Sequence, residues 1–63
     1  MDPVLRAKIE QLHTQDLHVE IVRLLEHLDA PDAESCSLLA RAYNNLGRYE
    51  EAERLLLAMP QPE

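Results

Sequence analysis

The sequence predicts an all-α fold of four short helices, and three observations support this class. Apolar residues recur at helical spacing in four segments, and no segment alternates apolar and polar residues with the period of a strand. The segment boundaries carry Asp, Pro and Gly, which are helix-starting or helix-ending residues. The single glycine of the chain separates the last two segments. We therefore expect two antiparallel helix pairs.

The first two segments each have a start signal. Asp2 followed by Pro3 starts the first helix, because the Asp side chain accepts from a free amide and proline suits the first helical position. This helix is expected to end near Thr14. Asp16 is expected to cap the second helix, and residues 29–31 (DAP) to stop it. The apolar sides of the two helices are predicted to be Leu5, Ile9 and Leu12, and then Leu17, Ile21, Leu24, Leu25 and Leu28.

The last two segments have clearer boundaries. Asp32 is expected to cap the third helix, and Gly47 to supply the left-handed residue that commonly ends a helix. Pro60 and Pro62 prevent continuation of the fourth. The predicted apolar sides are Cys36, Leu39, Ala40, Tyr43 and Leu46, and then Tyr49, Ala52, Leu55, Leu56 and Met59. Both tyrosines are thus expected to be packing residues, and the cysteine a buried, inert thiol.

Length and charge disfavour several classes of protein. At 63 residues the chain makes a single small domain. Twelve acidic and six basic residues give a net charge of -6, which is the wrong sign for binding nucleic acid. The first residues are charged, and no segment approaches the ~20 apolar residues of a membrane span. With one cysteine and no possible intrachain disulfide, we expect a cytoplasmic protein without a membrane partner.

The sequence offers no set of residues for catalysis, for a metal or for a cofactor. Glu10 and His13 form an E-x-x-H pair, but a di-iron site would need a second pair and two more carboxylates. His18 and His27 lie on opposite sides of one helix. Cys36 has no base beside it, and the one glycine cannot form a phosphate-binding loop. We predict a protein that is not an enzyme and holds neither metal nor cofactor.

The two helix pairs show weak internal repetition. When the chain is shifted so that Leu5 falls on Cys36, the apolar pattern of the first pair matches that of the second, although few residues are identical. The other superposed positions are Ile9 and Ala40, Leu12 and Tyr43, Ile21 and Ala52, Leu25 and Leu56, and Leu28 and Met59.

The second pair carries a recognisable motif. The segment 44–52, NNLGRYEEA, together with Leu39, Ala40 and Tyr43, resembles the tetratricopeptide repeat (TPR), a helix pair of about 34 residues. Ala40 and Ala52 are small where paired helices approach closely, and the larger Leu39 and Tyr43 fill the space beside them. The resemblance is good over residues 33–59.

The first pair keeps only the apolar skeleton of the family. QDLH at residues 15–18 replaces the Leu-Gly-x-Tyr turn. In the second pair, Cys36 stands where the family prefers tryptophan, and Pro60 comes before the usual helix end. We interpret residues 1–63 as one domain, with a degenerate repeat at 2–28 and a TPR-like repeat at 32–60.

The resemblance implies a short right-handed superhelix that serves as a non-catalytic scaffold and binds a protein or peptide. In that family the first helix of each pair lines a concave groove. The arginines at such positions could grip a ligand or be ordinary solvated residues, and the asparagines could clamp a peptide or end a helix. The candidate groove residues are Arg6, Glu10, His13, Ser37, Arg41, Asn44 and Asn45.

The last helix has more apolar residues than one side can hold. Three consecutive leucines cannot share a side, so at least one points away from the paired helix and needs a cover. Either the chain is the amino-terminal piece of a longer repeat array, or it forms a homo-oligomer through this helix. The residues of this surface are Leu55, Leu56, Leu57 and Met59.

Overall fold

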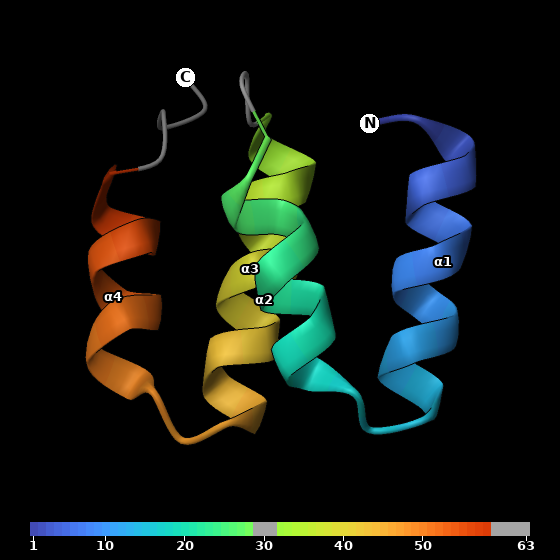
Figure 1. Ribbon diagram of the computed structural model, residues 1–63. Helices are drawn as coiled ribbons and strands as arrows, with labels where there is room; N and C mark the ends of the chain where they lie inside the picture. The colour runs from blue at the N-terminus through green and yellow to red at the C-terminus, as the bar shows by residue number, and fades with distance from the viewer. Residues whose placement is uncertain (29–31, 59–63) are drawn as a thin grey trace.

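The computed structural model describes residues 1–28 and 32–58, and within these ranges the chain is all-α and contains no strand (Figure 1). Four helices follow one another, as predicted. They are α1 (Pro3–Thr14), α2 (His18–Glu26), α3 (Ala33–Asn45) and α4 (Tyr49–Ala58). The second helix is shorter at its start than its apolar pattern predicted, and residues 29–31, which were expected to stop it, lie outside the described residues.

The caps predicted for α1 and α3 are confirmed. The Asp2 carboxylate accepts a hydrogen bond from the Val4 amide at 2.9 Å, and Pro3 occupies the first turn. The Asp32 carboxylate accepts from the Ser35 amide at 2.7 Å. Each contact satisfies one of the amides that have no partner within the first turn of a helix, so local sequence fixes both helix starts.

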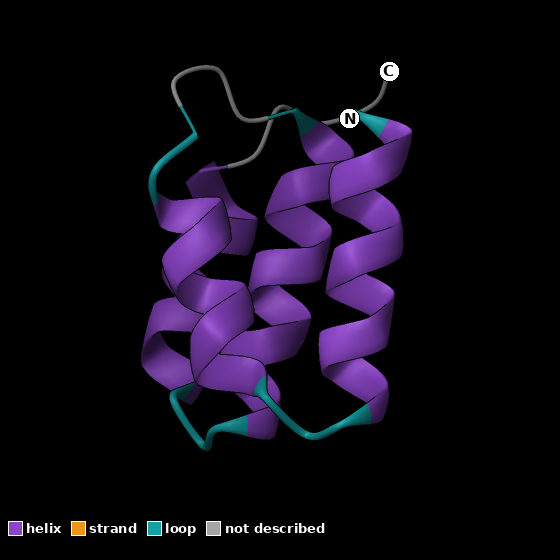
Figure 2. Cartoon of the chain, turned by 45° about the vertical axis from the view of Figure 1, so that its right-hand side comes forward, coloured by secondary structure: helices purple, strands orange, loops and turns teal. Residues whose placement is uncertain are grey.

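The helices pack in chain order, with α1 against α2, α2 against α3 and α3 against α4. The turn between α1 and α2 and the turn between α3 and α4 lie at the same end of the molecule (Figures 1 and 2). The structure is therefore two antiparallel helix pairs side by side. We call α1 with α2 the first unit, and α3 with α4 the second unit.

The two turns repeat the same backbone conformation at positions that the internal repeat superposes. Asp16 has a φ of 59° and Gly47 a φ of 77°, both in the left-handed region. In the first turn the Leu17 amide donates to the Leu12 carbonyl at 2.9 Å. In the second, the Arg48 amide donates to the Tyr43 carbonyl at 2.8 Å, which is the equivalent bond. The internal repeat is thus present in the backbone, although few residues are identical.

The prediction that Asp16 caps α2 is wrong. The residue before α2 is Leu17, which makes no side-chain capping bond. Asp16 instead takes the left-handed position that glycine takes in the second turn, a conformation that Asp tolerates better than most residues. Its carboxylate lies 3.5 Å from the Nε2 atom of His18.

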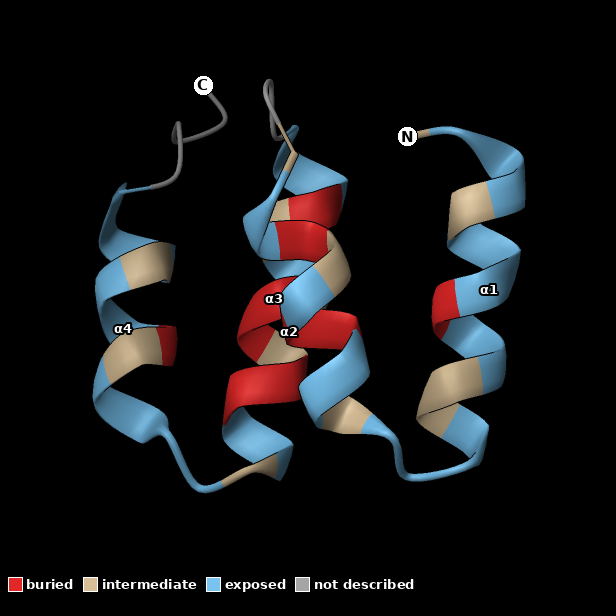
Figure 3. Ribbon diagram, viewed as in Figure 1, coloured by how far each residue is buried: buried red, intermediate tan, exposed pale blue. Residues whose placement is uncertain are grey.

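The core lies between the helices and is densest at α2 and α3 (Figure 3). Ile9 of α1 and Ile21 of α2 are fully buried side chains. Ala40 and Ala52 are also buried, as the close approach of paired helices predicted. The buried apolar residues are Ile9, Ile21, Val22, Leu25, Leu39, Ala40, Ala42, Tyr43 and Ala52.

Four packing predictions differ from the structure, and one of them is Leu56, which is 46% exposed. Tyr49 is 66% exposed and not a core residue, because it lies on a side of α4 that no described element covers. Leu17 is 43% exposed, since it belongs to the turn before α2 and not to the helix side that packs. Cys36 is a free thiol that is only half-buried. The prediction for Tyr43, in contrast, is confirmed.

Candidate functional site

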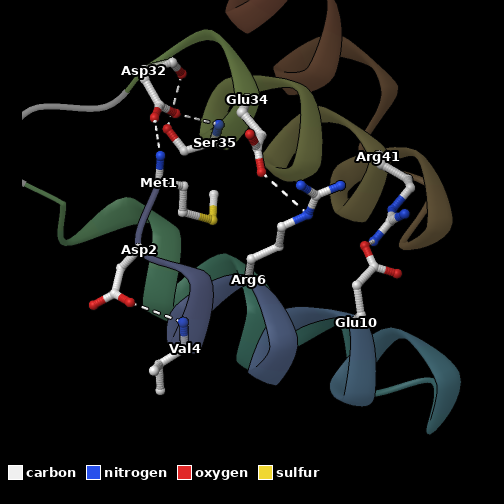
Figure 4. A network of polar contacts seen from close by, with 9 residues as sticks. All are labelled: Met1, Asp2, Val4, Arg6, Glu10, Asp32, Glu34, Ser35 and Arg41. Carbon is white, nitrogen blue, oxygen red and sulfur yellow. Dashed lines mark hydrogen bonds and ion pairs between the residues drawn. The ribbon is translucent and has the colours of Figure 1, made fainter.

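The candidate groove residues other than His13 lie on α1 and α3, and we call them the α1–α3 surface. Arg6 and Glu10 lie one turn apart on α1 and point toward α3 (Figure 4). The Arg6 Nε atom lies 3.4 Å from Glu34 Oε1, and the Arg41 Nη2 atom lies 3.2 Å from Glu10 Oε1. The two ion pairs connect the first unit to the second. Sequence reasoning missed the acidic partner of Arg6, because no local signal pairs residues on different helices so far apart in the chain.

These ion pairs are exposed and therefore weak. The side chains of Arg6 and Glu34 are 63% and 42% exposed, and those of Arg41 and Glu10 are 36% and 49% exposed. Pairs of this kind contribute about 0–1 kcal/mol, because water and salt screen them. A ligand carboxylate could replace Glu10 on Arg41 at little cost in folding stability.

The other predicted groove residues of α3 are accessible. Ser37, Asn44 and Asn45 are exposed, on the same helix as Arg41. The Asn44 carbonyl accepts a hydrogen bond from the Gly47 amide at 3.1 Å, so its backbone takes part in ending α3. Its side-chain amide can still offer a donor and an acceptor to a peptide backbone.

His13 is placed apart from this row. Its ring packs edge-on against the ring of His18 on α2, with 5.4 Å between the ring centroids. The Nδ1 atoms of both rings are buried without a hydrogen-bond partner among the described residues. The two rings pack together between α1 and α2. His13 is therefore directed toward its own unit and not toward the α1–α3 surface. No pattern in the sequence indicates this contact between His13 and His18 across the turn between α1 and α2.

A second set of polar contacts joins the start of the chain to α3. The Met1 ammonium lies 2.8 Å from Asp32 Oδ2, and the Met1 side chain is 2% exposed (Figure 4). The ammonium and the Ser35 hydrogen bonds lower the pKa of Asp32 from 3.8 to about 2, since they favour the charged carboxylate. The same carboxylate raises the pKa of the Met1 ammonium above 8.0. Asp32 therefore both caps α3 and holds α1 against it.

A depression of about 570 Å³ lies away from the α1–α3 surface, at the turn between α3 and α4. Arg48 and Glu51, which line it, form an ion pair, and the Arg48 guanidinium stands 4.8 Å from the centre of the Tyr43 ring. The positive charge of Arg48 is thus already bound within the molecule. We assign the depression to the structure of the turn, and the α1–α3 surface remains the candidate site.

The apolar surface predicted for the last helix divides into two parts. Leu55 is half-buried and packs against the core. Leu56 is 46% exposed and Leu57 is 74% exposed. Met59 lies outside the described residues. The expectation that at least one of the three leucines points away from the paired helix is confirmed, because Leu56 and Leu57 are both exposed.

Two further observations concern only the described residues. Among residues 1–28 and 32–58, no group of three or more His, Cys, Asp or Glu side chains could hold a metal ion. In the same ranges, no helix has the length and apolar character needed to cross a membrane.

Comparison of the chain with protein-family models, with curated proteins and with solved structures finds no match. The resemblance to the tetratricopeptide repeat therefore rests on the residues of this chain, namely the motif at residues 33–59 and the matching apolar pattern in the first helix pair.

Proposed function

We propose that this protein is a non-catalytic binding module of the tetratricopeptide type, which holds a protein or peptide partner on the α1–α3 surface in the cytoplasm. One observation carries the proposal. The two units repeat the same turn at superposed positions, down to the left-handed residue and the bond that follows it. When helix pairs repeat in this way, each pair exposes the equivalent helix side. Solenoid proteins form extended binding surfaces by this arrangement.

The chemistry of the α1–α3 surface supports a partner that is an extended peptide. Arg41 offers a guanidinium to a ligand carboxylate or carbonyl, and its bond to Glu10 is weak enough to exchange. Asn45 is exposed one turn further along the same helix and offers both a donor and an acceptor. A peptide backbone presents both kinds of group at regular intervals, so the two residues together suit main-chain recognition.

The alternative function is self-association through α4. The exposure of Leu57, at 74%, favours it, because a monomeric protein rarely leaves adjacent large apolar residues in water. Sedimentation of the purified chain over a range of concentrations tests this alternative. A dimer that dissociates when Leu57→Glu is introduced would support it, and a monomer at all concentrations would exclude it.

The binding proposal is tested by selection from a random peptide library displayed on phage, with the immobilised chain as bait. Arg41→Ala with Asn45→Ala should weaken the selected peptides at least tenfold, while the melting temperature changes little. The matched control is Arg23→Ala, which removes another arginine with an exposed carboxylate partner, on α2 and away from the α1–α3 surface.

Two results would count against the proposal. If no peptide is enriched above the level obtained with an unrelated acidic helical protein, the surface does not bind peptides. If the double variant loses stability in step with binding, Arg41 and Asn45 hold the fold together and do not contact a ligand.

A further inference from the structure

One side of α4 is formed by Tyr49, Glu53, Leu56 and Leu57, which recur at i, i+4, i+7 and i+8 and so share a helix side. We call these four residues the α4 face. Tyr49 is 66%, Leu56 46% and Leu57 74% exposed, and Glu53 is also exposed. No described element covers this face.

The internal repeat identifies the corresponding side of α2. Val22, Leu25 and Glu26 occupy the positions that Glu53, Leu56 and Leu57 occupy on α4. That side of α2 is covered by α3. Val22 and Leu25 are each only 3% exposed.

Two contacts define how α3 covers α2. Leu25 and Glu26 line a small apolar cavity of about 140 Å³ together with Ser35 and Leu39 of α3. The Tyr43 hydroxyl of α3 donates a hydrogen bond to Glu26 Oε1 at 2.8 Å. At the interface between the two units, α3 thus packs along α2. The α4 face is the corresponding surface of the second unit.

The α4 face differs from the α2 side in two chemical respects. Glu53 replaces the buried Val22, so the centre of the α4 face carries a negative charge. Leu57 replaces Glu26, so the acceptor that receives the Tyr43 hydroxyl on α2 is missing on α4. A helix that covers the α4 face should therefore bring a positive charge, and an apolar side chain without a hydroxyl where α3 has tyrosine.

A second copy of this chain does not supply such a helix. In head-to-tail stacking, α1 of the next copy would take the place of α3, and it presents Lys8 and Gln11 where α3 presents Leu39 and Ala42. Lys8 could face Glu53, but neither side chain fills an apolar interface as leucine and alanine do. Each copy also has a net charge of -6, which disfavours this stacking, and pairing of α4 with a second α4 is distinguished by sedimentation.

We infer that the α4 face is a second interaction surface, which binds a basic amphipathic helix of a partner protein, lying antiparallel to α4. The partner helix has a small residue at the position of Ser35, a leucine at that of Leu39 and a second small residue at that of Ala42. An apolar residue without a hydroxyl follows at the place of Tyr43. This inference shares with the proposed function only the internal repeat that superposes α2 on α4. The α1–α3 surface takes no part in it.

The probe is a synthetic peptide with the sequence of residues 32–46, held helical by a hydrocarbon bridge on its outer side. It carries Cys36→Ala and lysines beside the side that packs, within reach of Glu53, and it is made with Tyr43 or with Tyr43→Phe. Titration into the labelled full-length chain is followed by NMR. We expect shifts at Tyr49, Leu56 and Leu57, and binding of the Tyr43→Phe peptide about five- to tenfold tighter, because a buried hydroxyl without an acceptor is unfavourable.

Variants of the chain make the test specific. Leu57→Glu places a carboxylate at the position that Glu26 has on α2. In this variant the peptide with Tyr43 should therefore bind more tightly than the peptide with Tyr43→Phe. Leu56→Glu should abolish binding of both peptides. Val19→Glu is the matched control, because Val19 is an apolar residue of equal exposure, at 47%, on α2 away from the α4 face, and it should change nothing. A melting curve of each variant confirms that it is folded.

Several outcomes would overturn the inference. One is equal affinity of the two peptides for the chain and for Leu57→Glu, which would indicate unspecific apolar contact. Another is a set of shifts confined to the α1–α3 surface. A third is a dimer that sediments as such at the concentrations used and is broken by Leu57→Glu, which would assign the face to a second copy. Arg41→Ala with Asn45→Ala should leave this binding unchanged, so failure here is distinguishable from failure of the proposed function.

Discussion

Asp16 and Gly47 occupy the same position in two successive turns, and both have a left-handed backbone, with φ values of 59° and 77°. The internal repeat superposes them, and each is followed by an amide that bonds back to the preceding helix. Both turns thus require a left-handed residue, which is glycine in the second turn and aspartate in the first. The first turn is the more strained of the two, because left-handed backbone is less favourable for any residue with a Cβ atom.

Exchanges at these two positions should have opposite effects. Gly47→Ala should lower the free energy of unfolding by about 1–2 kcal/mol, which is the cost of a left-handed alanine. A Cβ atom at Gly47 would meet no atom within 4 Å, so the cost is conformational and not steric. Asp16→Gly should raise the free energy of unfolding by about 0.5–1 kcal/mol. Urea unfolding measures both, and a neutral Gly47→Ala would contradict the assigned turn.

The contact between Met1 and Asp32 should make stability depend on pH at both extremes. The pKa of Asp32 falls from 3.8 to about 2 on folding, so its contribution is complete above about pH 4 and is lost as pH falls toward 2. The pKa of the Met1 ammonium rises above 8.0, so its contribution is complete below pH 8 and is lost at higher pH.

The measurement is the melting temperature between pH 2 and pH 10. Asp32→Asn keeps a capping side chain but removes the charge, so it should lower the melting temperature most between pH 4 and pH 8 and little at pH 2. A synthetic chain with an acetylated Met1 amine is the control, and Asp32→Asn should have a smaller effect in it. An equal effect in both chains would mean that the ammonium contributes nothing.

The hydrogen bond from Tyr43 to Glu26 should be visible in two ways. Burial and the neighbouring Glu26 carboxylate raise the pKa of Tyr43 from 10.0 to about 12, so absorbance at alkaline pH should detect a phenol that ionises only near pH 12 or on unfolding. Tyr43→Phe removes this titration. It should lower the free energy of unfolding by about 1 kcal/mol, because one hydrogen bond is lost while the ring still fills its place.

Glu26→Gln separates the two causes of the raised pKa. The hydrogen bond can remain while the charge is removed, so the pKa of Tyr43 should move back toward 10.0 and the stability should change little. A pKa that stays near 12 in this variant would mean that the charge of Glu26 does not contribute to the shift.

The centre of the first unit depends on Ile9, which is 0% exposed. Ile9→Ala should lower the free energy of unfolding by about 2–5 kcal/mol, through lost apolar burial and the cavity that remains. For a domain of this size such a loss is a large part of the total stability, so the variant should be mostly unfolded at about 37 °C. The matched control on the same helix is Val4→Ala, since Val4 is 77% exposed and should change stability by less than about 0.5 kcal/mol. Circular dichroism as a function of temperature measures both.

Local sequence signals predict the all-α class, the four helices of the described residues and most of their ends. Asp2, Asp32 and Gly47 act through bonds and dihedral angles within a few residues, so no tertiary contact is needed to predict them. The candidate residues of the α1–α3 surface were also predictable as a row, because Arg6 and Glu10 on α1, and Arg41 on α3, follow the helical period.

Helices α2 and α3 each bury a second side, which depends on how the two units pack. Val22, Ser35 and Ala42 are each at most 3% exposed, although the pattern of a single helix marks only the side that faces its own partner. They lie where α2 and α3 meet across the two units. Tyr49 belongs to an equally apolar pattern and is exposed, because α4 has no described neighbour on that side.

The physical reason is that helical periodicity records the angle of a residue around its own axis and not the presence of a neighbour. The pairing of Glu10 with Arg41 and the stacking of His13 on His18 depend in the same way on how helices are placed in space. Burial and pairing are properties of two elements together. The sequence therefore determined the helices of this protein, and the packing of its two units determined which of their sides are interior and which are available to a partner.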